Sequence, residues 1–313
     1  MGRIAFFGTP EIAVPALDAC IASGHEVVVV VAQPDRPKGR GQKIEFPPVK
    51  ERAIARGIPV LQPTTLKRGT PDGDAFMRAL VEHAPDLSVV MAYGRIVPQR
   101  ILDVPRRGSV NVHASLLPRW RGAAPIQRAI GADDRETGVC LMKMVLALDE
   151  GDVLARARTP ISDDDDTESL GARLAGLGHD LLRAHLNALV DGTLTAEPQG
   201  DDGVTYAHML TKDEGAVDFT RKARALHCHA RAMQPWPGAF TTWNGEVMKL
   251  FLPVVVDARA EPGVVVEAGE LLVVGTGEGA IGYREIQAPS KKRMRVRDFV
   301  QGRPIAPGTV LGR

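Results

Sequence analysis

Residues 111 and 113 carry the two side chains of this chain that are best suited to chemistry. Asn111 and His113 lie two positions apart in the apolar run 109–113, which favours a β-strand. Alternate residues of a strand point to one face of its sheet, so both side chains should emerge together at the strand's end, where α/β sheets bind ligands. An amide N–H can stabilise a developing oxyanion, and an imidazole can transfer a proton near neutral pH. The pair therefore suits acyl transfer.

A carboxylate that could serve this imidazole lies in the acidic turn 148–152. The turn reads Leu-Asp-Glu-Gly-Asp and joins two predicted strands, 138–145 and 152–159. A carboxylate near an imidazole raises its pKa and fixes its orientation. Asp149, Glu150 and Asp152 compete for this role, and spacing alone does not choose among them. Taken by itself, the segment is typical of an ordinary hairpin turn.

Two basic segments are candidates for nucleic-acid contact. The first, residues 33–43, is a long insertion after a strand, and its basic side chains are Arg36, Lys38, Arg40 and Lys43. The second lies near the C-terminal end and begins with Lys291, Lys292 and Arg293. Solvated surface is the ordinary explanation for both. Long loops in α/β domains are nevertheless often functional, and small β-barrels commonly bind nucleic acids. With a net charge of +1, any such attraction must be local.

Two further patterns favour structural explanations. Gly8-Thr9-Pro10 follows the first strand and opens a helix, but it lacks the remaining glycines of a dinucleotide-binding turn, and Pro10 removes an amide. A nicotinamide dehydrogenase is therefore disfavoured. His227-Cys228-His229 has no further ligands at suitable spacing, so a packed helix is expected there and no metal site.

The order of the predicted elements indicates two domains. Strands and helices alternate from residue 3 to about 189, and five consecutive valines at 27–31 are typical of a strand buried on both faces. An α/β domain with a mostly parallel sheet is predicted over residues 1–192. Residues 193–207 are polar and are predicted to form a linker. Short apolar runs between Gly and Pro turns predict a small β-barrel over 208–313.

Composition excludes several classes of protein. The chain has 313 residues, of which 44% are hydrophobic, enough for two folded domains and too many for disorder. No apolar run reaches the roughly 18 residues of a membrane helix, and we expect neither an export signal nor a membrane partner. The distant thiols of Cys20, Cys140 and Cys228 favour a reduced, cytoplasmic protein without disulfides.

Several longer motifs together resemble one known protein family. The chain closely resembles the formyltransferases that use 10-formyltetrahydrofolate in the motifs Asn111-Val-His113, Ser115-Leu-Leu-Pro118, Arg119-Trp-Arg-Gly-Ala-Ala-Pro-Ile126 and Leu148-Asp-Glu-Gly-Asp152. The loop 33–43, the segment 231–238 and Lys291-Lys-Arg293 narrow the resemblance to the branch of this family that acts on methionyl-tRNA. The resemblance runs from the first strand to nearly the last residue.

This resemblance implies both a fold and an activity. The expected fold is a Rossmann-like formyltransferase domain with a mostly parallel sheet, followed by a smaller OB-like β-barrel domain that binds tRNA. The expected reaction transfers the formyl group of 10-formyltetrahydrofolate to the α-amino group of methionine on initiator methionyl-tRNA, for translation initiation. No metal is needed. We expect a monomer with folate and tRNA as its partners.

The resemblance also implies site residues, position by position. It places the catalytic trio on Asn111, His113 and Asp149. It assigns folate binding to Ser115, Leu116, Leu117, Pro118, Tyr93, Gly94, Arg95 and Ile96. It assigns tRNA contact to the basic side chains of both segments, above all to Arg40. One departure is visible, because Val145-Leu-Ala147 stands where relatives have a more polar stretch ending in Gly. The wall of the pterin pocket is therefore expected to differ.

Two rival functions would use much of the same machinery. A folate enzyme that formylates an amino sugar, or that hydrolyses the formyl group, would need the same three polar side chains, but a small acceptor would not require the basic segments. A non-catalytic RNA-binding protein with this fold would keep tRNA contact without binding folate. The presence of all three candidate catalytic residues counts against that second rival.

Overall fold

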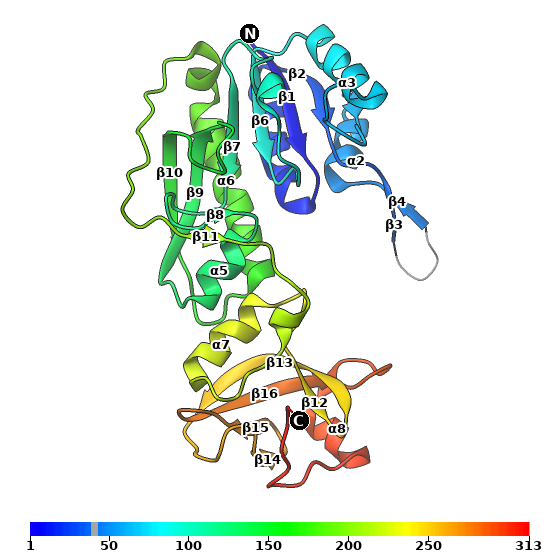
Figure 1. Ribbon diagram of the computed structural model, residues 1–313, viewed down its shortest axis with the longest axis vertical. Helices are drawn as coiled ribbons and strands as arrows, with labels where there is room; N and C mark the ends of the chain where they lie inside the picture. The colour runs from blue at the N-terminus through cyan, green and yellow to red at the C-terminus, as the bar shows by residue number, and fades with distance from the viewer. Residues whose placement is uncertain (39–42, 313) are drawn as a thin grey trace. The chain divides into compact units, whose positions relative to one another are not determined.

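The computed structural model describes residues 1–38 and 43–312, apart from the side chains of Lys38 and Lys43. The chain divides into two units (Figure 1). Unit 1 comprises residues 1–125, 136–160 and 171–207, and unit 2 comprises residues 126–135, 161–170 and 208–313. The segment 193–207, predicted to be a linker, lies within unit 1.

Unit 1 is organised around a sheet with the strand order β10-β9-β7-β6-β1-β2-β5. Its strands are β1 (Arg3–Gly8), β2 (Glu26–Val31), β5 (Val60–Leu61), β6 (Leu87–Met91), β7 (Ser109–His113), β9 (Glu136–Lys143) and β10 (Val153–Pro160). The pairs from β5 to β7 are parallel, whereas β9 is antiparallel to both β7 and β10. The predicted Rossmann-like, mostly parallel sheet is confirmed.

Helices connect the parallel strands and cover the sheet. They are η1 (Glu11–Ala13), α1 (Val14–Ile21), α2 (Pro48–Ala55), α3 (Pro71–Glu82), α4 (Gln99–Leu102) and the part of α6 (Thr167–Asp191) from residue 171 onward. Helix α5 (Pro125–Gly131) belongs to unit 2 from residue 126 onward. Helix α6 lies along the sheet (Figure 1). It packs closely at Gly178, where an added Cβ would lie 3.1 Å from Val112 of β7. Val112 therefore faces α6, and strand alternation turns Asn111 and His113 to the opposite face.

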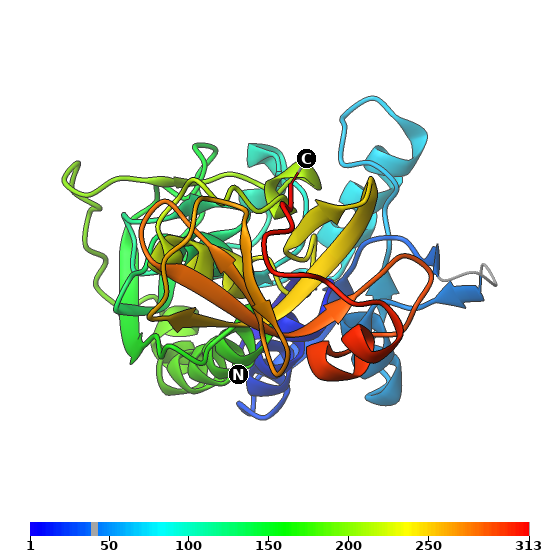
Figure 2. The ribbon, with the colours of Figure 1, turned by 90° about the horizontal axis from the view of Figure 1, so that it is seen from below.

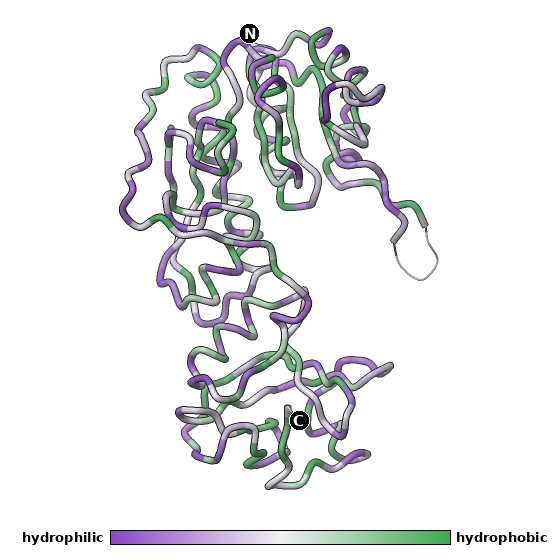
Figure 3. Tube along the Cα trace, viewed as in Figure 1, coloured by the Kyte–Doolittle hydropathy of each residue, from purple (hydrophilic) through white to green (hydrophobic). Residues whose placement is uncertain are grey.

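The core of unit 1 lies on its central strands. Val29, Val30 and Val31 of β2 are fully buried, as the valine run predicted. Phe7 of β1 makes an edge-to-face contact with Tyr93, with ring centroids 5.5 Å apart. The hydropathy of the chain trace follows this burial, with apolar residues gathered along the central strands (Figure 3). These strands form the rigid support on which the loops of the site rest.

Two small strand pairs complete unit 1. Strand β8 (Arg121–Gly122) pairs in parallel with β11 (Tyr206–Ala207), so the end of the 193–207 segment adds to the turn that follows β7. Strands β3 (Arg36–Lys38) and β4 (Lys43–Glu45) form an antiparallel pair on either side of residues 39–42. The long basic insertion is thus a β-hairpin at its base.

Unit 2 is built on an antiparallel sheet with the order β12-β13-β16-β15-β14, with β17 added to β16. Its elements are η2 (Asp213–Gly215), α7 (Ala223–Ala232), β12 (Phe240–Trp243), β13 (Glu246–Val256), β14 (Val265–Ala268), β15 (Leu272–Gly275), β16 (Ala280–Gln287), β17 (Met294–Arg295) and α8 (Val296–Gly302). The sheet curls along β13 and β16 (Figure 2), and Leu226 of α7 and Tyr283 are fully buried in its core. The predicted small barrel-like domain is confirmed. His227, Cys228 and His229 lie buried on α7, as the predicted packed helix requires.

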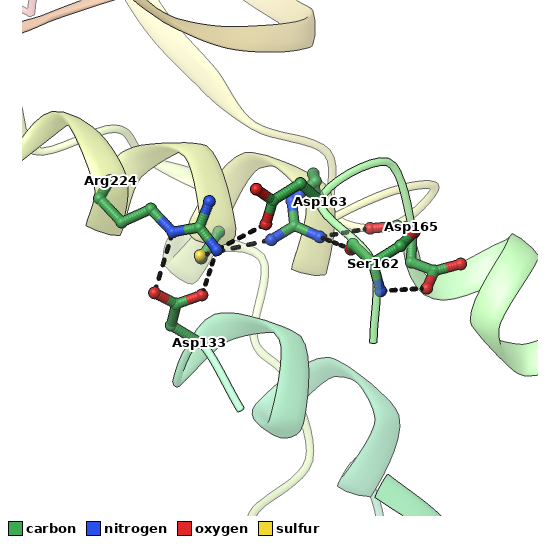
Figure 4. Close-up of polar contacts among 7 residues, drawn as sticks. Asp133, Ser162, Asp163, Asp165 and Arg224 are labelled. Atoms are coloured by element: carbon green, nitrogen blue, oxygen red, sulfur yellow. Dashed lines mark hydrogen bonds and ion pairs between the residues drawn. The ribbon is translucent and has the colours of Figure 1, made fainter. Parts of the chain in front are cut away.

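An arginine cluster ties residues 126–135 and 161–170 to α7 within unit 2 (Figure 4). The Arg224 guanidinium donates to Asp133 through Nε (2.9 Å) and Nη2 (2.5 Å), and to Asp163 through Nη2 (2.7 Å). Arg231 donates to the carbonyls of Ser162 (2.9 Å) and Asp165 (2.8 Å). These charge-assisted bonds place both segments on the helix.

The Arg224–Asp133 pair predicts a pH-dependent stability of unit 2. Hydrogen bonds from Arg224 lower the pKa of Asp133 from 3.8 to about 2. A carboxylate with a lowered folded-state pKa stabilises the fold above its unfolded pKa, and this contribution is lost as the pH falls through the folded value. Because the pair is about one-third exposed, we expect Asp133→Asn to cost only about 1 kcal/mol near neutral pH.

Urea unfolding of native protein and Asp133→Asn over a pH series measures this effect. The difference in unfolding free energy should shrink between about pH 4 and pH 2, with the exposed Asp257→Asn as the control that shows no such change. A difference that stays constant over this range would contradict the assignment.

Candidate functional site

The structure brings Asn111, His113 and Asp149 together on the face of β7 that is turned away from α6. Asp149 lies in the loop between β9 and β10, and its two carboxylate oxygens face different partners. Oδ1 accepts from Asn111 Nδ2 at 3.5 Å, and Oδ2 lies 3.7 Å from His113 Nδ1. The imidazole and the carboxylate are both largely buried. The three groups therefore meet on this face of β7, near the end of the strand.

The backbone fixes the orientation of the His113 ring. His113 Nε2 lies 3.0 Å from the carbonyl oxygen of Trp120. A carbonyl only accepts hydrogen bonds, so Nε2 carries the hydrogen and donates it. The other nitrogen, Nδ1, is left facing the carboxylate of Asp149.

Only one of the three competing acids of the turn faces the imidazole. Glu150 pairs with Arg121 at 3.1 Å, and Asp152 lies 3.5 Å from Lys143 Nζ. Asp149 instead turns inward, where its Oδ2 also accepts from the backbone N–H of Gly122 at 2.8 Å. Packing thus selects Asp149 as the acid that faces the imidazole, a choice that the spacing of the three acids did not determine.

Backbone conformation in the acidic turn is unusual. Asp149 has φ of +51°, a left-handed conformation that costs a non-glycine residue about 1 kcal/mol or more. Two residues later, an added Cβ on Gly151 would lie 1.8 Å from the carbonyl oxygen of Lys143. The chain can make this turn only with glycine at 151, and the turn directs the Asp149 side chain to the sheet.

The expected folate segment 115–118 divides into buried and accessible residues. Ser115 is fully buried and donates through Oγ to the carbonyl of Arg119 at 2.7 Å. Leu117 packs into a cluster with Cys140, Met142 and Val153. Leu116 and Pro118 are partly exposed. Ser115 and Leu117 therefore shape the segment from within, and the other two residues are available to a ligand.

In the second expected folate segment, 93–96, the backbone is more available to a ligand than most of the side chains are. The Tyr93 ring lies in the core, where burial raises the pKa of its hydroxyl to about 12. Its carbonyl accepts from Thr9 Oγ1 and from Gln33 Nε2, each at 3.1 Å. Arg95 donates to the carbonyl of Pro63 at 3.0 Å. Ile96 is 77% exposed and is the large apolar side chain that this segment presents to solvent.

The loop that carries Asp149 also exposes apolar side chains. Val145, Leu146 and Leu148 are all exposed, Leu146 by 64%. Exposed large apolar residues that follow one another in a loop commonly mark a ligand or interaction site. This loop therefore provides an apolar wall next to the carboxylate.

The basic residues expected to contact tRNA are only partly described. Arg36 is exposed on β3, whereas Arg40 and the side chains of Lys38 and Lys43 lie outside the described residues. In unit 2, Lys291 and Lys292 are exposed. Arg293 pairs with Glu285 and stacks over the ring of Phe251, with its guanidinium carbon 4.2 Å from the ring centroid. A stacked, paired arginine is held in place more firmly than its lysine neighbours.

The described residues contain neither a cluster of metal ligands nor a membrane-spanning helix. In residues 1–38 and 43–312, no three His, Cys, Asp or Glu side chains gather as metal ligands would. No helix in these ranges is both long and apolar enough to cross a membrane.

Sequence reasoning missed the residues that hold the trio in place. The Trp120 carbonyl, the Gly122 N–H and the Gln199 side chain all contact the trio. Two of these contacts are made by the backbone, which no residue type reveals. Gln199 lies in the predicted linker, where nothing in the sequence indicated a role.

Comparison with known proteins identifies the family of this chain. The formyl transferase family matches residues 2–186, and the formyl transferase C-terminal domain matches residues 209–304. A methionyl-tRNA formyltransferase of Myxococcus xanthus is 48% identical over 98% of this chain and 97% of its own length. The methionyl-tRNA formyltransferase of Methylococcus capsulatus is 49% identical over 99% of this chain and 99% of its own length. An N-formyltransferase from Helicobacter canadensis, solved with folinic acid and dTDP-3-aminofucose, shares the fold, with a TM-score of 0.70 and 18% identity over 92% of this chain and 100% of its own.

The hydrogen bond from His113 to the Trp120 carbonyl predicts the tautomer of the neutral ring. We expect 15N NMR of labelled protein to show the hydrogen on Nε2, with the His113 signals assigned by their loss in His113→Gln. A neutral ring protonated on Nδ1 would contradict the proposed orientation. His25, which has a different set of ring contacts, serves as the internal comparison.

Proposed function

This chain belongs to the formyltransferase family and, within it, to the methionyl-tRNA formyltransferases, and from this premise we propose that Asn111, His113 and Asp149 are its catalytic residues. The chain transfers the formyl group of 10-formyltetrahydrofolate to the α-amino group of methionine on initiator methionyl-tRNA, for translation initiation. The observation that carries the catalytic assignment is the convergence of an amide, an imidazole and a carboxylate around Asp149.

The residues near this trio suit the folate co-substrate, which supplies the activated formyl group. A pterin ring is flat, with apolar faces, and the exposed side chains of Val145, Leu146 and Leu148 offer an apolar wall for it. Leu116 and Pro118 add partly exposed apolar surface in the segment after β7. We propose that these residues, with the backbone of 93–96, hold the folate.

Asn111 is proposed to stabilise the oxyanion. Attack by the methionine amine on the formyl carbon places negative charge on the formyl oxygen, and a fixed amide N–H lowers the energy of that state. In this structure Asn111 Nδ2 donates to Asp149 at 3.5 Å, at the outer limit of a hydrogen bond. The amide is therefore free to turn to a better acceptor. One such donor is worth about 3 kcal/mol of barrier.

His113 and Asp149 are proposed to move the proton. As the new C–N bond forms, the amine nitrogen must lose a proton, and as the bond to the folate N10 breaks, that nitrogen gains one. The carboxylate and the Nδ1 face of the imidazole are the groups positioned for this exchange, since Nε2 is bonded to Trp120. The reaction is balanced, because the proton that leaves the amine replaces the formyl group on N10.

Direct assay of formyl transfer tests the activity and its acceptor. Purified protein is incubated with formyl-labelled 10-formyltetrahydrofolate and with charged initiator tRNA, an amino-sugar nucleotide or buffer alone. We expect label on the methionyl end of the tRNA and little on the sugar. Preferential transfer to the sugar, or release of formate in buffer, would overturn the acceptor assignment in favour of one of the rival enzymes.

Substitutions at β7 test the catalytic roles. We expect Asn111→Ala to lower kcat by about 100- to 1,000-fold, and His113→Ala to have a comparable effect, while circular dichroism and melting stay close to native. Asn187→Ala, at an exposed position on α6, is the matched control and should keep native turnover. Near-native kcat in either β7 variant would remove that residue from the chemistry.

The basic segments are proposed to contact tRNA. Arg40 is expected to matter most, and exposed Arg36, Lys291 and Lys292 support a basic surface at each segment. We also propose that residues 1–192 carry folate binding and catalysis and that 208–313 bind tRNA, in agreement with the two matched ranges. One copy of the chain contains the whole proposed trio, which supports action as a monomer. Membership in an enzyme family of translation supports a cytoplasmic location.

Arg40→Ala should raise the KM for methionyl-tRNA about tenfold and leave the KM for folate unchanged, because one lost phosphate contact weakens binding of the polyanion alone. Steady-state kinetics over a range of salt concentrations measures this, and the salt dependence should become shallower. Arg68→Ala, an exposed arginine elsewhere in unit 1, is the control. Unchanged tRNA kinetics in Arg40→Ala would refute the role of the loop.

A further inference from the structure

The two groups that touch the His113 ring both come from residues in an unusual backbone conformation. Asp149, beside Nδ1, has φ of +51°, and Trp120, whose carbonyl accepts from Nε2, has φ of +64°. Left-handed conformations of non-glycine residues persist only where the surroundings hold them. What holds these two turns therefore decides where the carboxylate and the carbonyl that contact the imidazole lie.

One side chain clamps the turn of Asp149. Gln199 Nε2 donates to the carbonyl of Asp149 at 2.8 Å and to that of Gly151 at 2.7 Å, so the two amide hydrogens bridge the turn. Gln199 Oε1 accepts from Arg121 Nε at 3.1 Å, and Arg121 also pairs with Glu150 of the same turn. Gln199 and Arg121 are both more than 90% buried. Both Nε2 and Oε1 of Gln199 are thus hydrogen-bonded to residues around the site.

The same stretch of chain holds the turn of Trp120. Thr205 Oγ1 accepts from the N–H of Trp120 at 2.9 Å, and the Thr205 carbonyl accepts from the N–H of Arg121 at 2.9 Å. The pairing of β8 with β11 continues this contact to Gly122, whose N–H donates to Asp149. Glu197 forms a two-way backbone bridge with Val153 at the other end of the stretch.

We propose that Gln199 and Thr205 are positioning residues for formyl transfer, and that residues 197–207 act as a clamp that fixes both partners of His113. Gln199 holds the carboxylate turn, and Thr205 holds the turn that presents the Trp120 carbonyl and the Gly122 N–H. Neither side chain contacts the reacting atoms. The inference rests on the proposed catalytic role of the trio, because the clamp acts through Asp149 and His113.

Four variants and a control test this clamp in the full-length protein. Gln199→Ala removes the bridging amide, and Gln199→Glu keeps its size but puts an acceptor where the carbonyls of Asp149 and Gly151 need a donor. Thr205→Val removes the acceptor for Trp120, and Thr205→Ser restores it. Asp202→Ala, at an exposed position of the same stretch, is the matched control.

Gln199→Ala, Gln199→Glu and Thr205→Val should lower kcat by about ten- to a hundredfold, with KM for tRNA and folate within about twofold of native. The pH profile of kcat and the 15N signals of the His113 ring should shift, and Thr205→Ser should recover most of the rate. The control should match the native enzyme.

Three results would overturn the clamp. One is native kcat in Gln199→Glu. Another is loss of kcat in Thr205→Ser equal to that in Thr205→Val. The third is loss of activity that follows only a lower melting temperature, with His113 signals and pH profile unchanged. If His113→Ala is inactive while the Gln199 variants are native, the clamp fails and the proposed function stands. If Asn111→Ala and His113→Ala are both active, the catalytic assignment itself fails.

Discussion

The carboxylate of Asp149 is the point on which the arrangement of this site depends. It lies against the Asn111 amide and the His113 imidazole and accepts the N–H of Gly122. A partly buried carboxylate needs such partners, because an isolated charge in a protein interior is strongly unfavourable. The contacts that satisfy this buried charge are therefore the same contacts that bring the amide and the imidazole together beside it.

Strand geometry provides the platform for this carboxylate. The close approach of α6 at Gly178 turns Val112 to one face of β7, and alternation leaves Asn111 and His113 on the other. A strand in the middle of a sheet is rigid, so the two side chains keep their spacing without further support. The loops that bring Asp149 and Trp120 to this platform are less constrained by themselves. They adopt left-handed turns that the 197–207 clamp supports.

The basic side chains of unit 2 fall into two groups, those paired within the fold and those exposed to solvent. In unit 2, Arg224 of α7 is neutralised by Asp133 and Asp163, and Arg231 donates to the carbonyls of 162 and 165 (Figure 4), so both arginines stabilise the fold. Lys291 and Lys292 lie exposed in the same unit. A chain of net charge +1 can thus present local positive surface to a polyanion, because part of its basic charge is internally paired.

Much of this could be predicted from the sequence by itself. Periodicity gave the order and type of the main elements, including the strand 109–113, although the strand predicted at 138–145 is β9, at Glu136–Lys143, and leaves Val145 in the apolar loop. Long motifs identified the family, and the resemblance placed the proposed catalytic trio on Asn111, His113 and Asp149. The elements and the family could be predicted because a residue type and its spacing directly determine local structure.

Other features were decided only by the tertiary structure. Packing selected Asp149 over Glu150 and Asp152, buried Ser115, Leu117 and the Tyr93 ring, and brought the predicted linker into unit 1 as the clamp. It also fixed the His113 tautomer through a backbone carbonyl. Every residue has such carbonyl and N–H groups, so no sequence pattern distinguishes the ones that will meet a side chain distant in the chain.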